Sequence, residues 1–161
     1  MHSDIKFIPA AVGIILDGEN KKILLIQRNK LPFKNMWSLP GGKIEPNEHV
    51  SQAILREVQE ECHIRCKIID YIGTVSEIVI ENNKIARHHI IHLFIINKID
   101  GEESANTKWV DLAKMKNDST IPPSDIVIID QMVIQRKHNY YNCVLTYDGH
   151  TYKLDKFDHL K

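Results

Sequence analysis

Residues 42–64 read GKIEPNEHVSQAILREVQEECHI, and this stretch decides the fold. Apolar residues recur there at helical spacing, which predicts an amphipathic helix over 47–62. On that helix Glu57, Glu60 and Glu61 are related by i, i+3 and i+4, so their carboxylates share one face and repel one another. Hard divalent cations such as Mg²⁺ or Mn²⁺ prefer oxygen ligands and would relieve this repulsion. The three glutamates are therefore candidate metal ligands.

The same stretch also has a longer spacing that a solvated acidic helix face would not by itself produce. Gly42 is followed six positions on by Glu48, and seven residues separate Glu48 from Arg56. The whole pattern resembles the Nudix box, which is G, five residues, E, seven residues and then R-E-apolar-x-E-E-x-G-apolar. The matching positions are Gly42, Glu48, Arg56, Glu57, Val58, Glu60, Glu61 and Ile64. His63 is the one departure, because the family pattern has glycine there.

The resemblance implies roles for individual residues. Glu60 and Glu61 are expected to bind Mg²⁺, and Mn²⁺ is expected to be able to replace it. Glu57 is expected to be either a ligand or the base that deprotonates water, unless a carboxylate outside the box takes this proton. A backbone carbonyl at Gly41 or Gly42 is expected to complete the metal's ligand set.

Arg56, in contrast, is expected to be structural. Members of the family pair this arginine with the glutamate at the position of Glu48, or with a neighbouring acid, and the pair orients the helix. Gly41 and Gly42 lack a Cβ, so the backbone there can turn sharply and approach a phosphate or metal. The glycine that the family has at the position of His63 serves a left-handed backbone at the helix end, which a residue with a Cβ reaches at a cost of about 1 kcal/mol. We expect a small loss of stability at that position and an intact active site.

Strand signals dominate the rest of the chain. Apolar or β-branched runs occur at 7–16, 22–27, 64–80, 87–96 and 108–110. Helical spacing returns at 125–137, after two prolines and a serine. The order of strands, helix, strands and helix favours an α+β fold. The resemblance covers about residues 5–139 and implies the Nudix αβα sandwich, a mixed sheet between helices. We expect one domain over 1–161, in which 140–161 form a C-terminal extension.

The extension carries a hairpin signal. Residues 144–147 and 151–154 flank Asp148-Gly149, a two-residue turn sequence between apolar runs. The default interpretation is an edge extension of the sheet. A cover over the cleft and a dimer contact are the open alternatives.

Basic residues outside the box are candidate substrate contacts. Arg28 closes the second expected strand and could meet a substrate phosphate, although a strand-end arginine is more often a solvated charge. Farther on, Arg87 and His89 share one face of a strand, while His88 and His92 share the other. His88 and His92 are too far apart on a strand to bind one metal ion. Base stacking or phosphate contact is the functional alternative to a half-exposed sheet face.

Composition limits the partners and the compartment. Lys plus Arg and Asp plus Glu both number 21, so the net charge is zero before histidine is counted, and nothing favours broad nucleic-acid or membrane binding. Three cysteines cannot all pair internally and no N-terminal segment resembles a signal peptide, so we expect a cytoplasmic protein. The spacing of Cys62 and Cys66 lacks a second ligand pair and does not favour zinc. A monomer and a homodimer are both compatible with the sequence.

The substrate prediction comes from the resemblance. Subgroups that prefer ADP-ribose or dinucleoside polyphosphates carry a Pro or a Tyr about fifteen to eighteen residues beyond the box, where residues 79–82 here read VIEN. Hydrolysis of a nucleoside triphosphate, as in MutT-like proteins, is therefore favoured, with ADP-ribose or another nucleotide conjugate as the alternative. A non-catalytic nucleotide sensor is a second class, but binding alone does not require three metal-binding carboxylates. No basic excess supports an RNA-end pyrophosphohydrolase.

Overall fold

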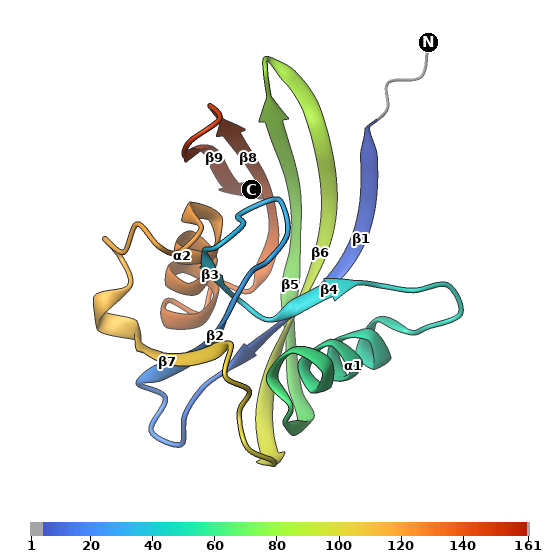
Figure 1. The fold of residues 1–161 in the computed structure, drawn as a ribbon, viewed down its shortest axis with the longest axis vertical. Coiled ribbons are helices and arrows are strands. Elements are labelled where there is room, and N and C mark those ends of the chain that lie inside the picture. Colours follow the sequence, from blue (N-terminus) through green and yellow to red (C-terminus); the bar gives the residue numbers. More distant parts are fainter. Residues whose placement is uncertain (1–4, 161) are drawn as a thin grey trace.

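The computed structural model describes residues 5–160, which form two sheets and two main helical segments (Figure 1). The strands are β1 (Lys6–Ile15), β2 (Lys22–Gln27), β3 (Trp37–Ser38), β4 (Gly41–Lys43), β5 (Arg65–Glu81), β6 (Lys84–Asp100), β7 (Thr107–Asp111), β8 (Asn139–Tyr147) and β9 (Tyr152–His159). The helices are α1 (Val50–Cys62), the 3₁₀ turn η1 (Leu112–Lys114), α2 (Pro123–Ile128) and the π-helical continuation η2 (Ile129–Ile134).

A mixed six-stranded sheet is the centre of the molecule. Its strand order is β4-β1-β6-β5-β8-β9, and a smaller sheet has the order β3-β2-β7. In the large sheet β1 runs parallel to β6 and β5 runs parallel to β8, while the other neighbours are antiparallel. Long hydrophobic runs such as 90–96 suit strands that are covered on both faces.

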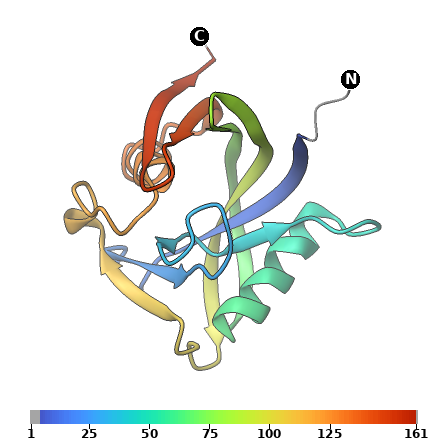
Figure 2. The same ribbon diagram turned by 45° about the horizontal axis from the view of Figure 1, so that its top comes forward.

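The two helices pack on opposite faces of the strands. Alternation along β6 sends Leu93 into a core cluster with Ile128 and Met132 of α2 and η2. Its neighbour Phe94 lies in a second cluster with Ile54 of α1. Figures 1 and 2 show α1 on the side of the large sheet near β4, and α2 on the other side beside β9. The predicted α+β sandwich with a mixed sheet between helices is therefore confirmed.

The helix boundaries differ from the prediction. The first helix begins at Val50 and not at residue 47, because Asn47 has φ 65° and so cannot continue a right-handed helix. The second helix begins at Pro123, widens into η2 and ends at Ile134, short of the predicted residue 137. Arg136, at φ 54°, ends the helical path there.

The C-terminal hairpin is confirmed and is longer than predicted. β8 joins the edge of β5, and β9 is the outermost strand of the large sheet. In the connecting turn, the Asp148 side chain accepts hydrogen bonds from the backbone N–H groups of His150 (2.8 Å) and Thr151 (2.7 Å). Gly149 has φ 96°, a conformation that favours glycine. The interpretation of the hairpin as an edge extension of the sheet is thus the correct one.

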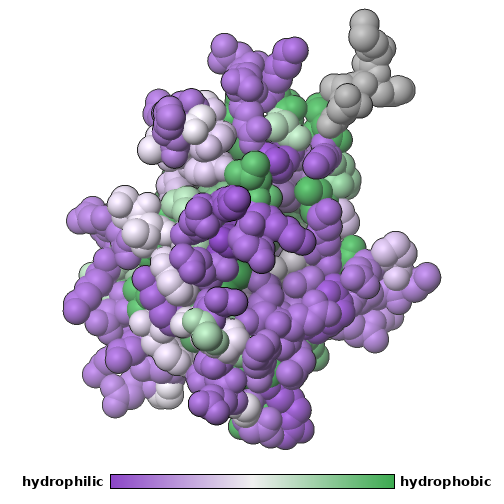
Figure 3. All heavy atoms as spheres, in the orientation of Figure 1, coloured by the Kyte–Doolittle hydropathy of each residue, from purple (hydrophilic) through white to green (hydrophobic). Residues whose placement is uncertain are grey.

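Hydrophilic residues predominate on the face in Figure 3, and the hydrophobic residues there form small separate patches. Among the helices of residues 5–160, none combines the length and the hydrophobicity needed to cross a membrane. All three cysteines are free thiols, and two of them, Cys62 and Cys143, are buried.

Candidate active site

Helix α1 is held at both ends by its flanking residues. At its start, the backbone N–H of His49 donates to Gln52 Oε1 at 2.8 Å. At its end, His63 has φ 60° and ψ 23°, and its N–H donates to the carbonyl of Gln59 at 3.1 Å. His63 therefore adopts the left-handed conformation that the box glycine would provide, with a Cβ in place.

Arg56 organises the acidic face of α1. Its Nε donates to Glu48 Oε1 at 2.7 Å and one terminal nitrogen donates to Glu48 Oε2 at 3.0 Å. The other terminal nitrogen lies 2.8 Å from Glu57 Oε1 and 3.4 Å from Glu60 Oε2. These hydrogen bonds from Arg56, and one from the backbone N–H of Glu45, lower the pKa of Glu48 to about 2. The predicted pairing of Arg56 with Glu48 is present in the structure.

Two glycines let the backbone lie directly against these carboxylates. The N–H of Gly41 donates to Glu61 Oε1 at 2.9 Å. A Cβ on Gly42 would lie 2.5 Å from the carboxyl carbon of Glu57. A Cβ on Gly41 would lie 2.3 Å from the carbonyl oxygen of Ala11, and its φ of 157° is also rarely adopted by other residues. Neither position can therefore hold a side chain without moving its neighbours.

The three glutamates keep oxygen atoms available. Burial raises the pKa of Glu61 to about 7, opposed by the Gly41 N–H and reinforced by the nearby charge of Glu57. Among residues 5–160, only one oxygen of each of Glu57, Glu60 and Glu61 accepts a hydrogen bond. Glu60 is more exposed than Glu57, with 59% and 15% of their side-chain surfaces accessible.

This donor set suits a hard divalent cation, because it consists of carboxylate oxygens beside backbone carbonyls. In the described part of the chain, however, no three His, Cys, Asp or Glu side chains are already arranged around one metal position. Arg56 instead contacts Glu57 and Glu60. That Gly41, Glu57, Glu60 and Glu61 bind the metal thus stays a prediction. The chemistry of these residues is compatible with it.

Arg28, just after β2, lies within electrostatic reach of Glu61 on α1. Its Nε donates to the carbonyl of Pro32 at 2.7 Å, and its side chain makes no ion pair with residues 5–160. Its positive charge is close enough to lower the pKa values of both Glu61 and Asp125, against larger opposing effects of burial. A guanidinium that makes no ion pair in the described chain and influences both carboxyl groups is a candidate phosphate contact.

Asp125 on α2 was not predicted from the sequence. Its Oδ2 accepts the N–H of Leu39 at 3.0 Å, two residues before the Gly41 N–H that Glu61 accepts. Burial raises the pKa of Asp125 to about 7, and the nearby Glu77 reinforces this effect. The only sequence signal was an acid in the first turn of a helix, which is common because it complements the helix dipole.

Arg87 and His89 face the same side of the sheet as predicted, but each has a partner on β5. Arg87 forms an ion pair with Glu81. His89 Nδ1 lies 3.1 Å from Glu77 Oε1, and both of these residues are buried. His88 and His92, on the opposite face, contact Ser76 and Thr74. Substrate contact by Arg87 and His89 stays a prediction. It would require the substrate to reach these side chains while they are paired with Glu81 and Glu77, or these pairs to separate.

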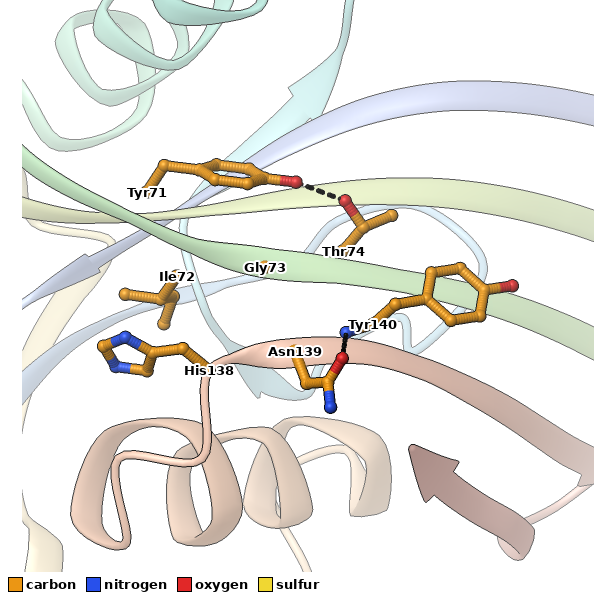
Figure 4. A pocket seen from close by; sticks show the side chains of 7 residues that line it. All are labelled: Tyr71, Ile72, Gly73, Thr74, His138, Asn139 and Tyr140. Atoms are coloured by element: carbon orange, nitrogen blue, oxygen red, sulfur yellow. Dashed lines mark hydrogen bonds between the residues drawn. The ribbon is translucent and has the colours of Figure 1, made fainter. Parts of the chain in front are cut away.

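Two hollows lie elsewhere on the surface. One, of about 390 Å³, is located where β5 and β8 begin to pair, and Figure 4 shows its lining from Tyr71 to Thr74 and from His138 to Tyr140. The other, of about 510 Å³, lies between the hairpin turn, the loop around Lys34 and the start of α2. Neither is lined by the glutamates of α1, so the candidate active site is defined by its chemistry and not by either hollow.

Comparisons with known proteins agree with this geometry. An ADP-ribose pyrophosphatase of Methanocaldococcus jannaschii is 38% identical over 96 residues, which are 59% of this chain and 54% of that protein. An 8-oxo-dGTP diphosphatase of Proteus vulgaris is 38% identical over 73 residues, or 44% of this chain and 65% of that protein. The chain thus spans between about half and two thirds of the length of these relatives.

Solved structures show the same fold. A MutT protein from Bacillus halodurans superposes with a TM-score of 0.72 and 20% identity, covering 94% of this chain and 96% of that one. The family model described as NUDIX domain matches residues 7–132, which include α1 and the glycine loop before it. On its sequence, its fold and the arrangement of its acidic helix, this chain belongs to the NUDIX domain family.

Proposed function

We propose that this protein is a Nudix pyrophosphohydrolase that cleaves the phosphoanhydride link of a nucleotide, with a nucleoside triphosphate as the favoured substrate. One observation carries the proposal: Arg56 and the glycine loop hold Glu57, Glu60 and Glu61 together on α1 with unpaired oxygens. A nucleotide-binding protein without chemistry would gain nothing from this mutual repulsion. The related 8-oxo-dGTP diphosphatase supports a triphosphate substrate.

Nudix hydrolases generally use divalent metal ions, and we propose Mg²⁺, with Mn²⁺ able to replace it. Glu60, Glu61 and the carbonyl of Gly41 would hold it, and Glu57, the other predicted ligand, would instead be the base. When bound, such an ion neutralises phosphate charge and lowers the pKa of a coordinated water.

The protein's own groups would position the substrate and move the proton. Arg28 would bind a phosphate oxygen, because its guanidinium makes no ion pair in the described chain and its charge acts on both Glu61 and Asp125. Glu57 would accept the proton of the attacking water at Oε2, the oxygen that Arg56 leaves free. The water oxygen then bonds to phosphorus as the bridging P–O bond breaks. Asp125 would contact the nucleobase, where a pKa near 7 lets its carboxyl either accept or donate a hydrogen bond.

Hydrolysis of ADP-ribose is the second candidate, favoured by the similarity to the Methanocaldococcus jannaschii pyrophosphatase. It uses the same glutamates and differs only in what lies beyond the second phosphate. Cytoplasmic location, and a monomeric or homodimeric state, stay predictions.

The test is an assay of phosphate, pyrophosphate and nucleoside monophosphate release from a nucleotide panel that includes ADP-ribose, with Mg²⁺, with chelator, and with Mg²⁺ restored. We expect turnover of a nucleoside triphosphate that disappears with chelator and returns with Mg²⁺ or Mn²⁺. Glu60→Gln and Glu61→Gln should each lose orders of magnitude in kcat while remaining folded. Tight binding of a nucleotide that the parent protein never cleaves would identify a sensor instead.

A further inference from the structure

The C-terminal hairpin reaches the loop that carries Arg28. The hairpin strands β8 and β9 lie beyond residues 7–132, the part of the chain that the family model matches. Figure 2 shows the turn of this hairpin next to the loop between β2 and β3. Residues 29–36 form that loop, which we call the phosphate loop because Arg28 precedes it.

Tyr152, the first residue of β9, makes the contact. Its hydroxyl oxygen accepts the backbone N–H of Phe33 at 3.0 Å. Its ring centre lies 4.4 Å from the ring of Phe33 and 4.4 Å from the ring of Tyr147. Phe33 is buried at φ 65°, a conformation that a bulky residue keeps only when its surroundings enforce it. Tyr152 supplies both a hydrogen bond and a packing surface for this conformation.

The phosphate loop in turn holds Arg28. The carbonyl next to Phe33, that of Pro32, accepts the hydrogen bond from Arg28 Nε at 2.7 Å. The Arg28 backbone pairs with the other end of the loop, since its N–H donates to Met36 at 2.9 Å and its carbonyl accepts from Asn35 at 2.8 Å. The Pro32 carbonyl therefore orients the side chain of Arg28. The position of that carbonyl depends in turn on Phe33, which Tyr152 contacts.

We propose that Tyr152 is a positioning residue for Arg28, so that the hairpin sets how well the active site binds a substrate phosphate. This inference rests on the proposed function, in which Arg28 contacts a phosphate. The plain alternative is that Tyr152 only fills space between the hairpin and the loop. The two differ in what happens when the hydroxyl alone is removed.

A double-mutant cycle separates them. Tyr152→Phe keeps the ring contacts and removes the hydrogen bond to Phe33, and we expect kcat/KM to fall roughly three- to tenfold, mainly through KM. In an Arg28→Gln background the same change should alter kcat/KM by less than about twofold, because the group it positions is gone. Tyr141→Phe is the matched control, since that hydroxyl donates to the Lys137 carbonyl at 2.7 Å on the same hairpin but away from the phosphate loop. Equal losses in both backgrounds, or an equal loss in the control, would overturn the proposal.

A second readout does not depend on turnover. The ¹⁵N–¹H resonance of Arg28 Nε, assigned by its absence in Arg28→Gln, reports the hydrogen bond to Pro32 directly. We expect Tyr152→Phe to shift or broaden it and Tyr141→Phe to leave it in place. An unchanged resonance in Tyr152→Phe contradicts the positioning role. A shifted resonance in a protein that cleaves no nucleotide would instead refute the proposed function and keep the structural link.

Discussion

Two half-buried carboxyl groups accept hydrogen bonds from opposite ends of residues 39–41, and their different surroundings suggest different roles in the proposed chemistry. Glu61 on α1 accepts the N–H of Gly41, and Asp125 on α2 accepts the N–H of Leu39. Burial raises the pKa of both to about 7. Their neighbours differ, however, because Glu61 shares its helix face with two more glutamates, whereas the acid near Asp125 is Glu77, which lies on β5 and contacts His89.

The difference indicates separate tasks for two groups with similar proton affinities. Several carboxylates held together are what a metal ion requires, because their repulsion is relieved only when a cation binds. A carboxyl outside such a cluster that exchanges a proton near neutral pH is suited to recognising a hydrogen-bonding edge of a ligand. The charge of Arg28 acts on both carboxyl groups, so we expect the substrate phosphates to bind at Arg28, between the metal and the group that Asp125 recognises.

The largest expected effect belongs to the α1 side. Glu57→Gln keeps the size and the helix propensity of the residue and its contact with Arg56, but removes the charge that chemistry needs. Nucleotide affinity should stay within about tenfold while turnover falls roughly a hundredfold or more. Steady-state kinetics with calorimetric binding would show this. Near-normal turnover in the variant would mean that an acid outside α1 does the work.

Arg56 supports only the α1 side of the comparison. Arg56→Ala leaves Glu48 and Glu57 without their strongest hydrogen-bond donor, so we expect the free energy of unfolding to fall by roughly 1–2 kcal/mol. Urea denaturation measures it. Arg65→Ala is the control, because Arg65 pairs with Asp100 on the exposed surface and its removal should matter little. Equal losses would show that the Arg56 network adds nothing beyond a surface pair.

The raised pKa of Asp125 should make the free energy of unfolding depend on pH. The unfolded carboxyl ionises near 3.8 and the folded one near 7, so the folded state binds more protons between these values and loses stability as pH rises. Asp125→Asn removes this loss, and between pH 5 and pH 8 its stability should improve relative to the parent by roughly 1–2 kcal/mol.

Asp118→Asn provides the comparison for that measurement. Hydrogen bonds from Thr120 lower the pKa of Asp118, so this group is ionised in both folded and unfolded states above pH 5. Its effect on the urea midpoint should therefore be the same at pH 5 and pH 8. A pH-independent effect of Asp125→Asn as well would remove the contrast on which its proposed role depends.

His63 should give the smallest effect. Replacing it with glycine should raise the free energy of unfolding by about 0.5–1 kcal/mol, because residue 63 is left-handed, and should hardly change kcat. Asn47→Gly, at φ 65°, should stabilise less, since asparagine tolerates this conformation. A large drop in kcat for His63→Gly with folding intact would show that the imidazole takes part in the reaction.

The α1 side could be predicted from the sequence because its chemistry is local. Helical spacing alone places Glu57, Glu60 and Glu61 on one face, and the resemblance to the Nudix box implied that Arg56 pairs with Glu48 or a neighbouring acid. The left-handed turn at Asn47 escaped prediction, since asparagine is compatible with either a cap or a turn. The π-helical widening after Ile128 also escaped prediction, because no local sequence signal was read as marking it.

The other side depends on contacts between residues far apart in the chain. Asp125 meets Leu39 across 86 residues, and Tyr152 meets Phe33 across 119. Neither pair has a periodicity or a motif that brings it together, because each forms only when the sheet has assembled. For Arg87 and His89 the prediction was correct only in part. Strand alternation predicted that they share one face of the sheet. Their pairing with Glu81 and Glu77 could not be predicted, because it depends on the register between β5 and β6.

The division between the two carboxyl groups is tested most directly by titrating Mn²⁺ into the protein and following the free ion by electron paramagnetic resonance. The parent should bind Mn²⁺, Glu61→Gln should weaken its affinity by roughly tenfold or more, and Asp125→Asn should leave it unchanged within about twofold. A protein that binds no Mn²⁺, or two variants that weaken it equally, would contradict the assignment of the metal to α1.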